Sequence, residues 1–504
     1  MSDITNEIAG LPPDRRRLLE LLLKREATPH TRSLTIPRRD GVGPVPLSFA
    51  QQRLWFLNQL EPDSAAYNVP AALRLDGRLN VETLERTLSE IVRRHEVLRT
   101  TFKVVDGQAA QVVRDAWAWD LLVEDLSGWP QRLREAEARN RSLKEARRPF
   151  DLSKGIAMRA TLLRLDETDH VILLTLHHIV ADGWSMGVLV REVAELYRAF
   201  SSGQEPSLPE LPIQYADFTL WERQLLKADA LGTQLAYWKR QLGGRLPTLE
   251  LPADRMQPAA STRNGASLIF TLPSSLAQPL RDLCRQEKVT LYVLLLAAYA
   301  GLLYRYTGQE DILIGTPTAN RKRAETEPLI GCFINTLVMR INVSGNPSFR
   351  ELLSRVREVV LAAFEHDDVP FERLVEELRP ERSQSHQRIF QVWFVLQNAP
   401  TQTLELPDLT LSDFGLLRET SQFDLALSMT EAHEQLTAAL NYSTDKFDAD
   451  TIAQMAEHFT LLLMEVAADP ERRLLEIPLS PEEPQGDDED DEADVYELDE
   501  DFVM

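Results

Sequence analysis

Helix-like and strand-like hydrophobic patterns alternate through the middle of this chain. In residues 81–92 the apolar side chains recur at the spacing of one helix face, and Asn80 before them is a preferred N-cap residue. Residues 171–176 form an almost continuous apolar run of strand length, which predicts a strand buried on both faces. Helical spacing resumes at 186–200, so this region predicts a strand, a polar turn and a helix.

The second half of the chain repeats this alternation of helix and strand signals. Together the two halves predict an α/β protein with two lobes of similar size, and no short-period repeat is visible. The elements expected in the second half are helices at 276–287, 291–304 and 349–366 and strands at 312–315, 337–343 and 390–396.

Composition divides the 504 residues into four parts. Residues 1–43 are polar apart from an amphipathic stretch at 13–24, which predicts a short helix followed by a linker. The two lobes are expected at 44–225 and 226–480. Residues 481–504 form an acidic tail with too few apolar side chains for a core, so we expect it to be disordered or to dock on a partner.

The net charge of −23 is unevenly distributed. Residues 482–501 hold thirteen acidic side chains and no basic one, and without them the net charge is −10. No basic stripe indicates nucleic acid, no apolar run of about 18 residues indicates a membrane span, and the N-terminus lacks the features of a secretory signal. Two cysteines are too few for a disulfide framework. These features favour a cytoplasmic protein without nucleic-acid or membrane partners.

A histidine motif, His177-His178-x3-Asp182-Gly183, follows the predicted buried strand. Imidazole titrates near neutral pH, so it can accept a proton from a reacting group. Neighbouring residues of an extended chain point to opposite sides, so one histidine is expected in a cleft and the other inside the fold. Asp182 is expected to pair with a distant arginine and lock the loop, while Gly183 leaves room for a ligand.

Two other interpretations of the motif have less support. The pair could be two structural histidines at the end of a strand. A metal site would need further ligands, and the sequence has no H-E-x-x-H or C-x-x-C pattern and no third clustered ligand. We therefore predict neither a metal nor a bound cofactor.

The histidine motif resembles the active-site motif of the condensation domains of nonribosomal peptide synthetases, which are similar in fold to chloramphenicol acetyltransferase. Further stretches resemble other motifs of that family and follow its order from about residue 44 to 480, although the seventh motif, at 382–388, lacks its usual proline. The matching stretches are LSFAQQRLWFL at 47–57, RHEVLRTTF at 94–102, YADFTLW at 215–221, IGCFINT at 330–336 and HDDVPFE at 366–372.

The resemblance implies two acetyltransferase-like lobes arranged as a V-shaped pseudo-dimer, with a tunnel between them. A donor thioester and an acceptor would arrive on the phosphopantetheine arms of carrier proteins and meet at His178. His177 would point into the fold, and Asp182 and Gly183 would complete the active-site loop.

Two residues of the second half are expected to support this loop. Arg321 is similar to the residue that pairs with the motif aspartate in the family, so we expect an ion pair between Asp182 and Arg321. Asn335, in the fifth motif, either faces the cleft or supports the fold, and we group it with Arg321 as structural support.

The implied activity is transfer of an acyl or peptidyl group from a carrier-protein thioester to an amine or a hydroxyl, in a nonribosomal peptide or hybrid polyketide–peptide pathway. Heterocyclising relatives replace the two histidines, which are present here, and details such as Phe390-Gln391-Val392 resemble the subtype that joins two L-residues. The alternatives are a non-catalytic recruitment module of the same fold and a coenzyme A-dependent acyltransferase acting on small molecules.

The expected partners follow from what the sequence lacks. It contains no adenylation signature and no serine-bearing carrier motif, so donor and acceptor carrier proteins are expected to bring the substrates. Other synthetase subunits are also expected as partners, and the acidic tail is their contact site if it docks and is not simply disordered. The chain is either free-standing or an excised piece of a larger synthetase.

Overall fold

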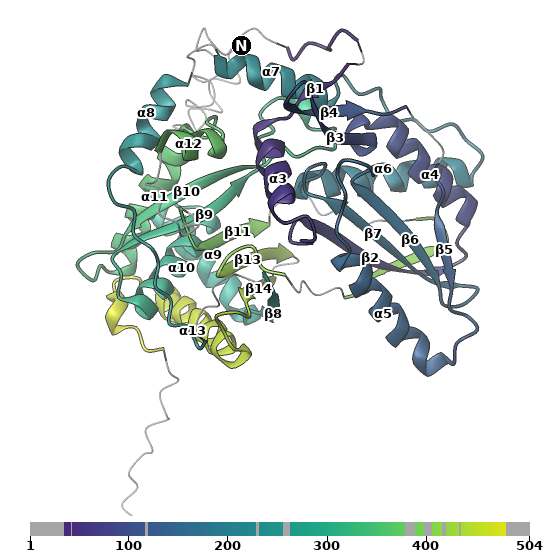
Figure 1. The fold of residues 1–504 in the computed structure, drawn as a ribbon. Helices are drawn as coiled ribbons and strands as arrows, with labels where there is room; N and C mark the ends of the chain where they lie inside the picture. The colour runs from purple at the N-terminus through teal and green to yellow at the C-terminus, as the bar shows by residue number, and fades with distance from the viewer. Residues whose placement is uncertain are drawn as a thin grey trace, which may run out of the picture.

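The computed structural model describes residues 35–479, except for 42, 116–118, 228–230, 256–262, 379–388, 398–405, 416–419 and 433–434. The predicted helix at 13–24, the loose seventh motif and the acidic tail lie outside the described residues. The described chain forms two lobes, each with a mixed sheet, flanking helices and its own hydrophobic core (Figure 1).

The first lobe is built on a five-stranded sheet with the order β12-β2-β7-β6-β5, beside a small sheet with the order β1-β4-β3. Helices α4 and α6 pack against each other, and α5 lies against β2 and β7. The helices are α3 (Phe49–Leu60), α4 (Val81–Arg94), α5 (Gln131–Arg147), α6 (Gly183–Ser201) and α7 (Tyr215–Lys227). The strands are β1 (Val45–Pro46), β2 (Asn68–Gly77), β3 (Thr100–Val105), β4 (Gln108–Val113), β5 (Leu122–Asp125), β6 (Met158–Arg164), β7 (Asp169–His177) and β12 (Leu409–Asp413).

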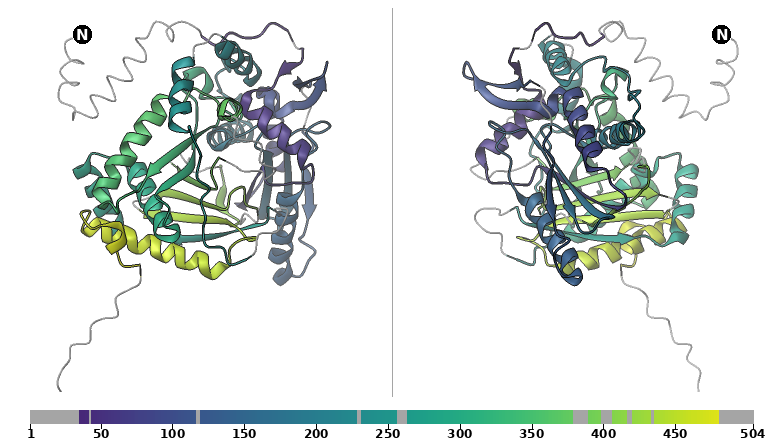
Figure 2. Two further views of the ribbon diagram at one scale, coloured as in Figure 1. Left: turned by 60° about the vertical axis from the view of Figure 1, so that its left-hand side comes forward. Right: turned by 90° about the vertical axis from the view of Figure 1, so that its right-hand side faces the viewer.

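The second lobe is built on a six-stranded sheet with the order β10-β9-β11-β13-β14-β8. Helices α9, α10, α11 and α13 pack on one another against this sheet, with α13 running along its outer side (Figure 2). The helices are α8 (Gly232–Gln241), α9 (Ser274–Glu287), α10 (Leu291–Thr307), α11 (Phe349–Glu365), α12 (Phe371–Leu378) and α13 (Ala449–Ala468). The strands are β8 (Gly265–Thr271), β9 (Asp311–Thr318), β10 (Asn335–Asn342), β11 (Val392–Gln397), β13 (Leu425–Ala432) and β14 (Gln435–Ser443).

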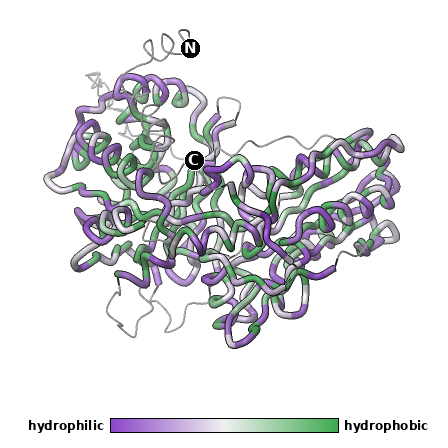
Figure 3. Tube along the Cα trace, turned by 90° about the horizontal axis from the view of Figure 1, so that it is seen from above, coloured by the Kyte–Doolittle hydropathy of each residue, from purple (hydrophilic) through white to green (hydrophobic). Residues whose placement is uncertain are grey.

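Within the described residues, the predicted helices and strands are confirmed with small shifts at their ends. Asn80 caps α4, where its side-chain oxygen accepts a hydrogen bond from the Thr83 N–H at 2.9 Å. Helix α10 is buried almost throughout, because its apolar residues surround the helix instead of following one face. Apolar segments run through the interior of both lobes and hydrophilic segments follow the outside (Figure 3).

Two segments of the second half of the chain belong to the first lobe, which departs from a simple division at residue 225. Strand β12 comes from the second half of the sequence, yet it pairs antiparallel with β2 at the edge of the first sheet. The loop between β9 and β10 also crosses over, since Leu329, Ile330 and Phe333 are buried in the core of the first lobe. The crossing loop lies beside the histidine motif, whereas β12 pairs with the other end of β2, since Leu73 is opposite Ile172 and Asn68 is opposite His177.

Candidate functional site

The histidine motif occupies the turn between a central strand and a helix of the first lobe. His177 is the last residue of β7, and Asp182 is the N-cap of α6. The His178 N–H donates to the Tyr67 carbonyl oxygen at 2.8 Å, which continues the pairing of β7 with β2 beyond the end of the strand. A rigid sheet therefore fixes where the loop begins, and a capped helix fixes where it ends.

His178 lines a cavity of about 530 Å³ to which both lobes contribute. Its Nδ1 lies 3.1 Å from the Ala181 carbonyl oxygen. A carbonyl oxygen can only accept a hydrogen bond, so Nδ1 carries the proton of the neutral ring and Nε2 carries the lone pair. The loop thereby selects the tautomer in which Nε2 can accept a proton.

His177 points into the fold, as predicted. Its side chain is only 2% exposed, and its Nδ1 accepts a hydrogen bond from the Ile179 N–H at 3.0 Å. The ring packs edge-on against Phe150 with 5.9 Å between centroids. Burial lowers the pKa of His177 to about 3, with smaller contributions from His178 and Arg159. His177 is therefore a neutral, structural ring near pH 7.

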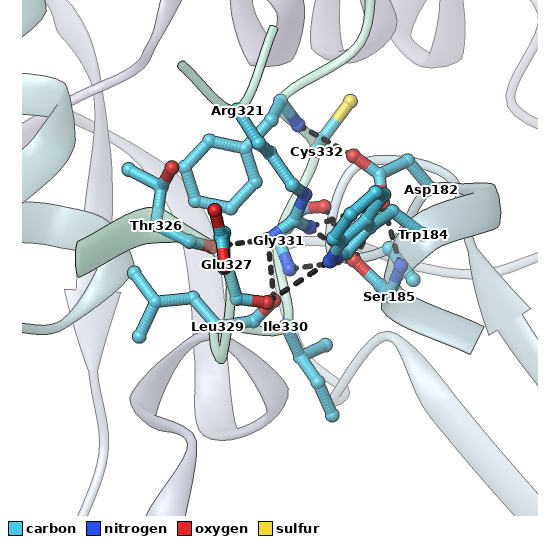
Figure 4. A network of polar contacts seen from close by, with 12 residues as sticks. Asp182, Trp184, Ser185, Arg321, Thr326, Glu327, Leu329, Ile330, Gly331 and Cys332 are labelled. Atoms are coloured by element: carbon cyan, nitrogen blue, oxygen red, sulfur yellow. Dashed lines mark hydrogen bonds and ion pairs between the residues drawn. The ribbon is translucent and has the colours of Figure 1, made fainter. Parts of the chain in front are cut away.

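The Asp182 carboxylate accepts several hydrogen bonds from the protein, and these bonds stabilise the loop of the histidine motif (Figure 4). One oxygen accepts from the Ser185 N–H at 2.8 Å and from Arg321 Nη2 at 3.1 Å. The other oxygen accepts from the Phe333 N–H at 3.0 Å. Asp182 is 3% exposed, so these bonds are formed away from water. These bonds hold the loop against the segment that contains Arg321 and Phe333.

Arg321 is the predicted partner of Asp182, and the structure brings them together. Its Nη1 donates to the Leu329 carbonyl oxygen at 2.7 Å, and its Nη2 also contacts Ser185 Oγ at 2.9 Å. The guanidinium lies over the Phe333 ring, 4.0 Å from the centroid. Burial lowers the pKa of Arg321, and Asp182 opposes this shift. The pair joins the loop of the histidine motif to the crossing loop of the second half.

Asn335 and Gly183 have contrasting surroundings. Asn335 is 7% exposed, and its amide donates to the carbonyl oxygens of Asp367 and Val369 at 3.0 and 2.9 Å. It therefore supports the fold and does not face the cleft. Gly183 lines the cavity, and a Cβ built there would meet no atom within 4 Å. The space beside Gly183 is open, as expected for a position close to a ligand.

Sequence reasoning missed several residues that hold the site. Ser185 is fully buried, and its Oγ bonds to the backbone of Gly331 through both the N–H and the carbonyl group, at 3.0 and 2.8 Å. Trp184 Nε1 donates to the Glu327 carbonyl oxygen at 2.9 Å. Both residues directly follow the motif, so their position was a signal, but their partners lie more than a hundred residues away.

A second cavity, of about 880 Å³, adjoins the first. It lies between α3 and α12, one helix from each lobe, and its lining combines apolar and aromatic side chains with charged ones such as Arg223, Arg263 and Glu376. The residues that line both cavities are Arg53, Tyr67, Glu372, Gln422 and Phe423. Arg53 Nη1 lies 3.9 Å from a Glu372 oxygen at this junction, and burial raises the pKa of Glu372. The two cavities therefore meet at the seam between the lobes.

Neither a metal-binding cluster nor a membrane-spanning helix occurs within the described ranges. Among those residues, no group of three or more His, Cys, Asp or Glu side chains could hold a metal ion. In the same part of the chain, no single helix has the length and apolarity needed to cross a membrane. The bent pair α9–α10 meets those criteria only jointly, and α10 lies in the core of the second lobe.

The chain is similar in sequence to the members of one protein family. The family model described as "Condensation domain" matches residues 43–487. A protein of the linear gramicidin synthase from Brevibacillus parabrevis is 49% identical over 437 residues, which are 86% of this chain and 6% of that protein. Phosphinothricin tripeptide synthetase PhsC from Streptomyces viridochromogenes is 42% identical over 95% of this chain and 44% of its own length. The chain thus spans less than half the length of these relatives.

Solved structures share the same architecture. The X-domain from teicoplanin biosynthesis matches with a TM-score of 0.80 and 31% identity, over 88% of this chain and 100% of that one. The first condensation domain of the calcium-dependent antibiotic synthetase matches with a TM-score of 0.72 over 87% of this chain and 100% of that one. At 22% identity, the second likeness shows the fold alone.

Proposed function

Because the chain belongs to the condensation-domain family of nonribosomal peptide synthetases, we propose that it transfers an acyl or peptidyl group from a carrier-protein thioester to an amine. The observation that carries this proposal is the placement of His178. Its ring lines the cavity shared by the lobes, and its Nδ1–H is directed to the Ala181 carbonyl oxygen, so Nε2 has the lone pair that a proton acceptor needs.

The proposed step balances without an added cofactor. The amine nitrogen attacks the thioester carbonyl carbon, and a C–N bond forms as the carbonyl becomes an oxyanion. His178 Nε2 takes the proton from nitrogen, the C–S bond breaks, and the thiolate leaves and takes up a proton. An α-amino group has a pKa of about 7.7–8.0, so much of it is already neutral near pH 8. For such acceptors, His178 orients the amine and holds the charge that develops on nitrogen.

Hydroxyl acceptors make a stronger demand on His178, because an alcohol is a poor nucleophile unless its proton is removed. We therefore expect His178→Ala to slow ester formation by about 10²–10⁴-fold and amide formation by less. The measurement is the initial rate of product formation by mass spectrometry, with one acyl group on a phosphopantetheinyl carrier and paired amine and alcohol acceptors. Equal losses with both acceptor types would contradict the assignment of His178 as the base.

A non-catalytic recruitment function is the second candidate, and the likeness to the teicoplanin X-domain favours it. One solved structure is described as a complex of that X-domain with OxyB, so a domain of this fold can bind a partner protein. The same assay separates the candidates, because a recruitment module would form no product from any acceptor. The third alternative is a coenzyme A-dependent acyltransferase. It is tested by supplying the same acyl group on coenzyme A, because such an enzyme would form product in the absence of a carrier protein.

A further inference from the structure

The second sheet presents two different faces along β11, β13 and β14. Side chains of a strand alternate between faces, and here one face is buried in the core of the second lobe. Phe394, Leu427 and Leu440 lie on that buried face and are 0–1% exposed. The opposite face lines the cavity that contains His178, and its lining residues include Trp393, Val395, Gln397, Ala426, Ser428 and Asn441.

Strand register arranges these cavity-facing residues in two rows. In the first row, Trp393 pairs with Ala426, which pairs with Asn441. In the second row, Val395 pairs with Ser428. The middle strand, β13, thus contributes only small side chains at both positions. A trough runs along β13, because a methyl and a hydroxymethyl group stand where longer side chains would fill the space.

The two sides of the trough are held in place. On one side, Trp393 stacks on Phe423 with 4.8 Å between ring centroids and 8° between planes. On the other side, the Asn441 amide donates to the carbonyl oxygens of Ala266 and Thr420, each at 3.2 Å. Rigid neighbours on both sides give the trough a defined width, which is what a pocket needs in order to discriminate by size.

We propose that this trough, formed by Ala426 and Ser428 between Trp393 and Asn441, binds the apolar side chain of one reactant and so selects substrates by size. The inference rests on the proposed function and adds a specificity site to it. His178 and the trough line the same cavity, so a reactant whose carbonyl or amine meets His178 can place its side chain in the trough. The trough offers no charged side chain, which favours an aliphatic or aromatic substituent over an ionised one.

The test is to fill the trough with Ala426→Leu. Transfer rates are measured for thioester donors whose side chains grow from methyl to isobutyl to benzyl, and then for amine acceptors with the same series. We expect the rate for the benzyl substrate of one series to fall at least about 10-fold relative to the methyl substrate. The series that responds identifies whether the donor or the acceptor uses the trough.

Two controls keep the result interpretable. Thr430→Leu makes a similar change further along the same face of β13, at a residue that is not among those lining the cavity, and should leave the size preference unchanged. Trp393→Ala widens the trough and should relax the size preference in the opposite direction. Loss of activity by the same factor for all substrates would overturn the inference, since it would indicate a passage and not a selective pocket. An inactive wild-type chain would instead refute the proposed function.

Discussion

At the scale of single residues, the site depends on a buried charge pair. The side chains of Asp182 and Arg321 are 3% and 1% exposed. The carboxylate accepts hydrogen bonds from Ser185 in its own loop and from Arg321 and Phe333 in the crossing loop. Removing one member of a buried pair leaves the other charge without compensation, which costs far more than loss of a surface pair. This pair therefore contributes to both the stability of the fold and the position of His178.

We expect Arg321→Ala to lower the free energy of unfolding by about 3–5 kcal/mol, because Asp182 would stay buried without its cation. The matched control is Arg198→Ala at the other end of α6, where Arg198 pairs with Glu195 on the surface. That change should cost less than about 1 kcal/mol. Urea unfolding measures both variants, and equal costs would show that the buried pair does not support the fold.

The residue scale also shows the limits of sequence reasoning. The histidine motif and its place after a buried strand were visible because they are local. The partner of Asp182 is 139 residues away, and only the resemblance to a family indicated it. Ser185 carried no such indication, since a serine after a motif is common and its bonds to Gly331 exist only in the folded chain.

At the scale of elements, β12 is the segment that most directly ties the second half to the first sheet. Its pairing with β2 ends at Gly77, whose φ of +132° suits glycine. A Cβ at Gly77 would lie 2.1 Å from the Asp408 carbonyl oxygen, so a side chain there would displace the start of β12.

Periodicity predicted the main helices and strands, but it could not place β12, because a short strand pattern does not specify its partner.

We expect Gly77→Ala to loosen β12 and to cost about 1–3 kcal/mol through steric strain. Hydrogen exchange of the amides at 409–413 should become faster, while exchange in the second sheet should change little. Gly128→Ala is the control, since a Cβ at Gly128 would meet nothing within 4 Å. Equal exchange at 409–413 in the two variants would mean that Gly77 does not govern the crossing.

At the scale of the whole molecule, two lobes of one fold enclose two adjoining cavities, and His178 lines one of them. The crossing strand and the crossing loop hold the lobes together, so the geometry around His178 depends on both halves of the chain. The sequence predicted two lobes because the same alternation of helices and strands occurs twice. It could not predict the cavities, since their walls combine residues from strands that are far apart in the sequence.

The most direct test of this account is whether a reactant arm reaches His178. Aminopantetheine, in which an amine replaces the terminal thiol, can be acylated with a bromoacetyl group. This probe would alkylate an accessible imidazole, because Nε2 displaces bromide from the carbon. Peptide mass spectrometry then locates the modified residue. The account predicts modification at His178 and its loss in His178→Ala, whereas an unmodified His178 in a chain that still transfers acyl groups would contradict it.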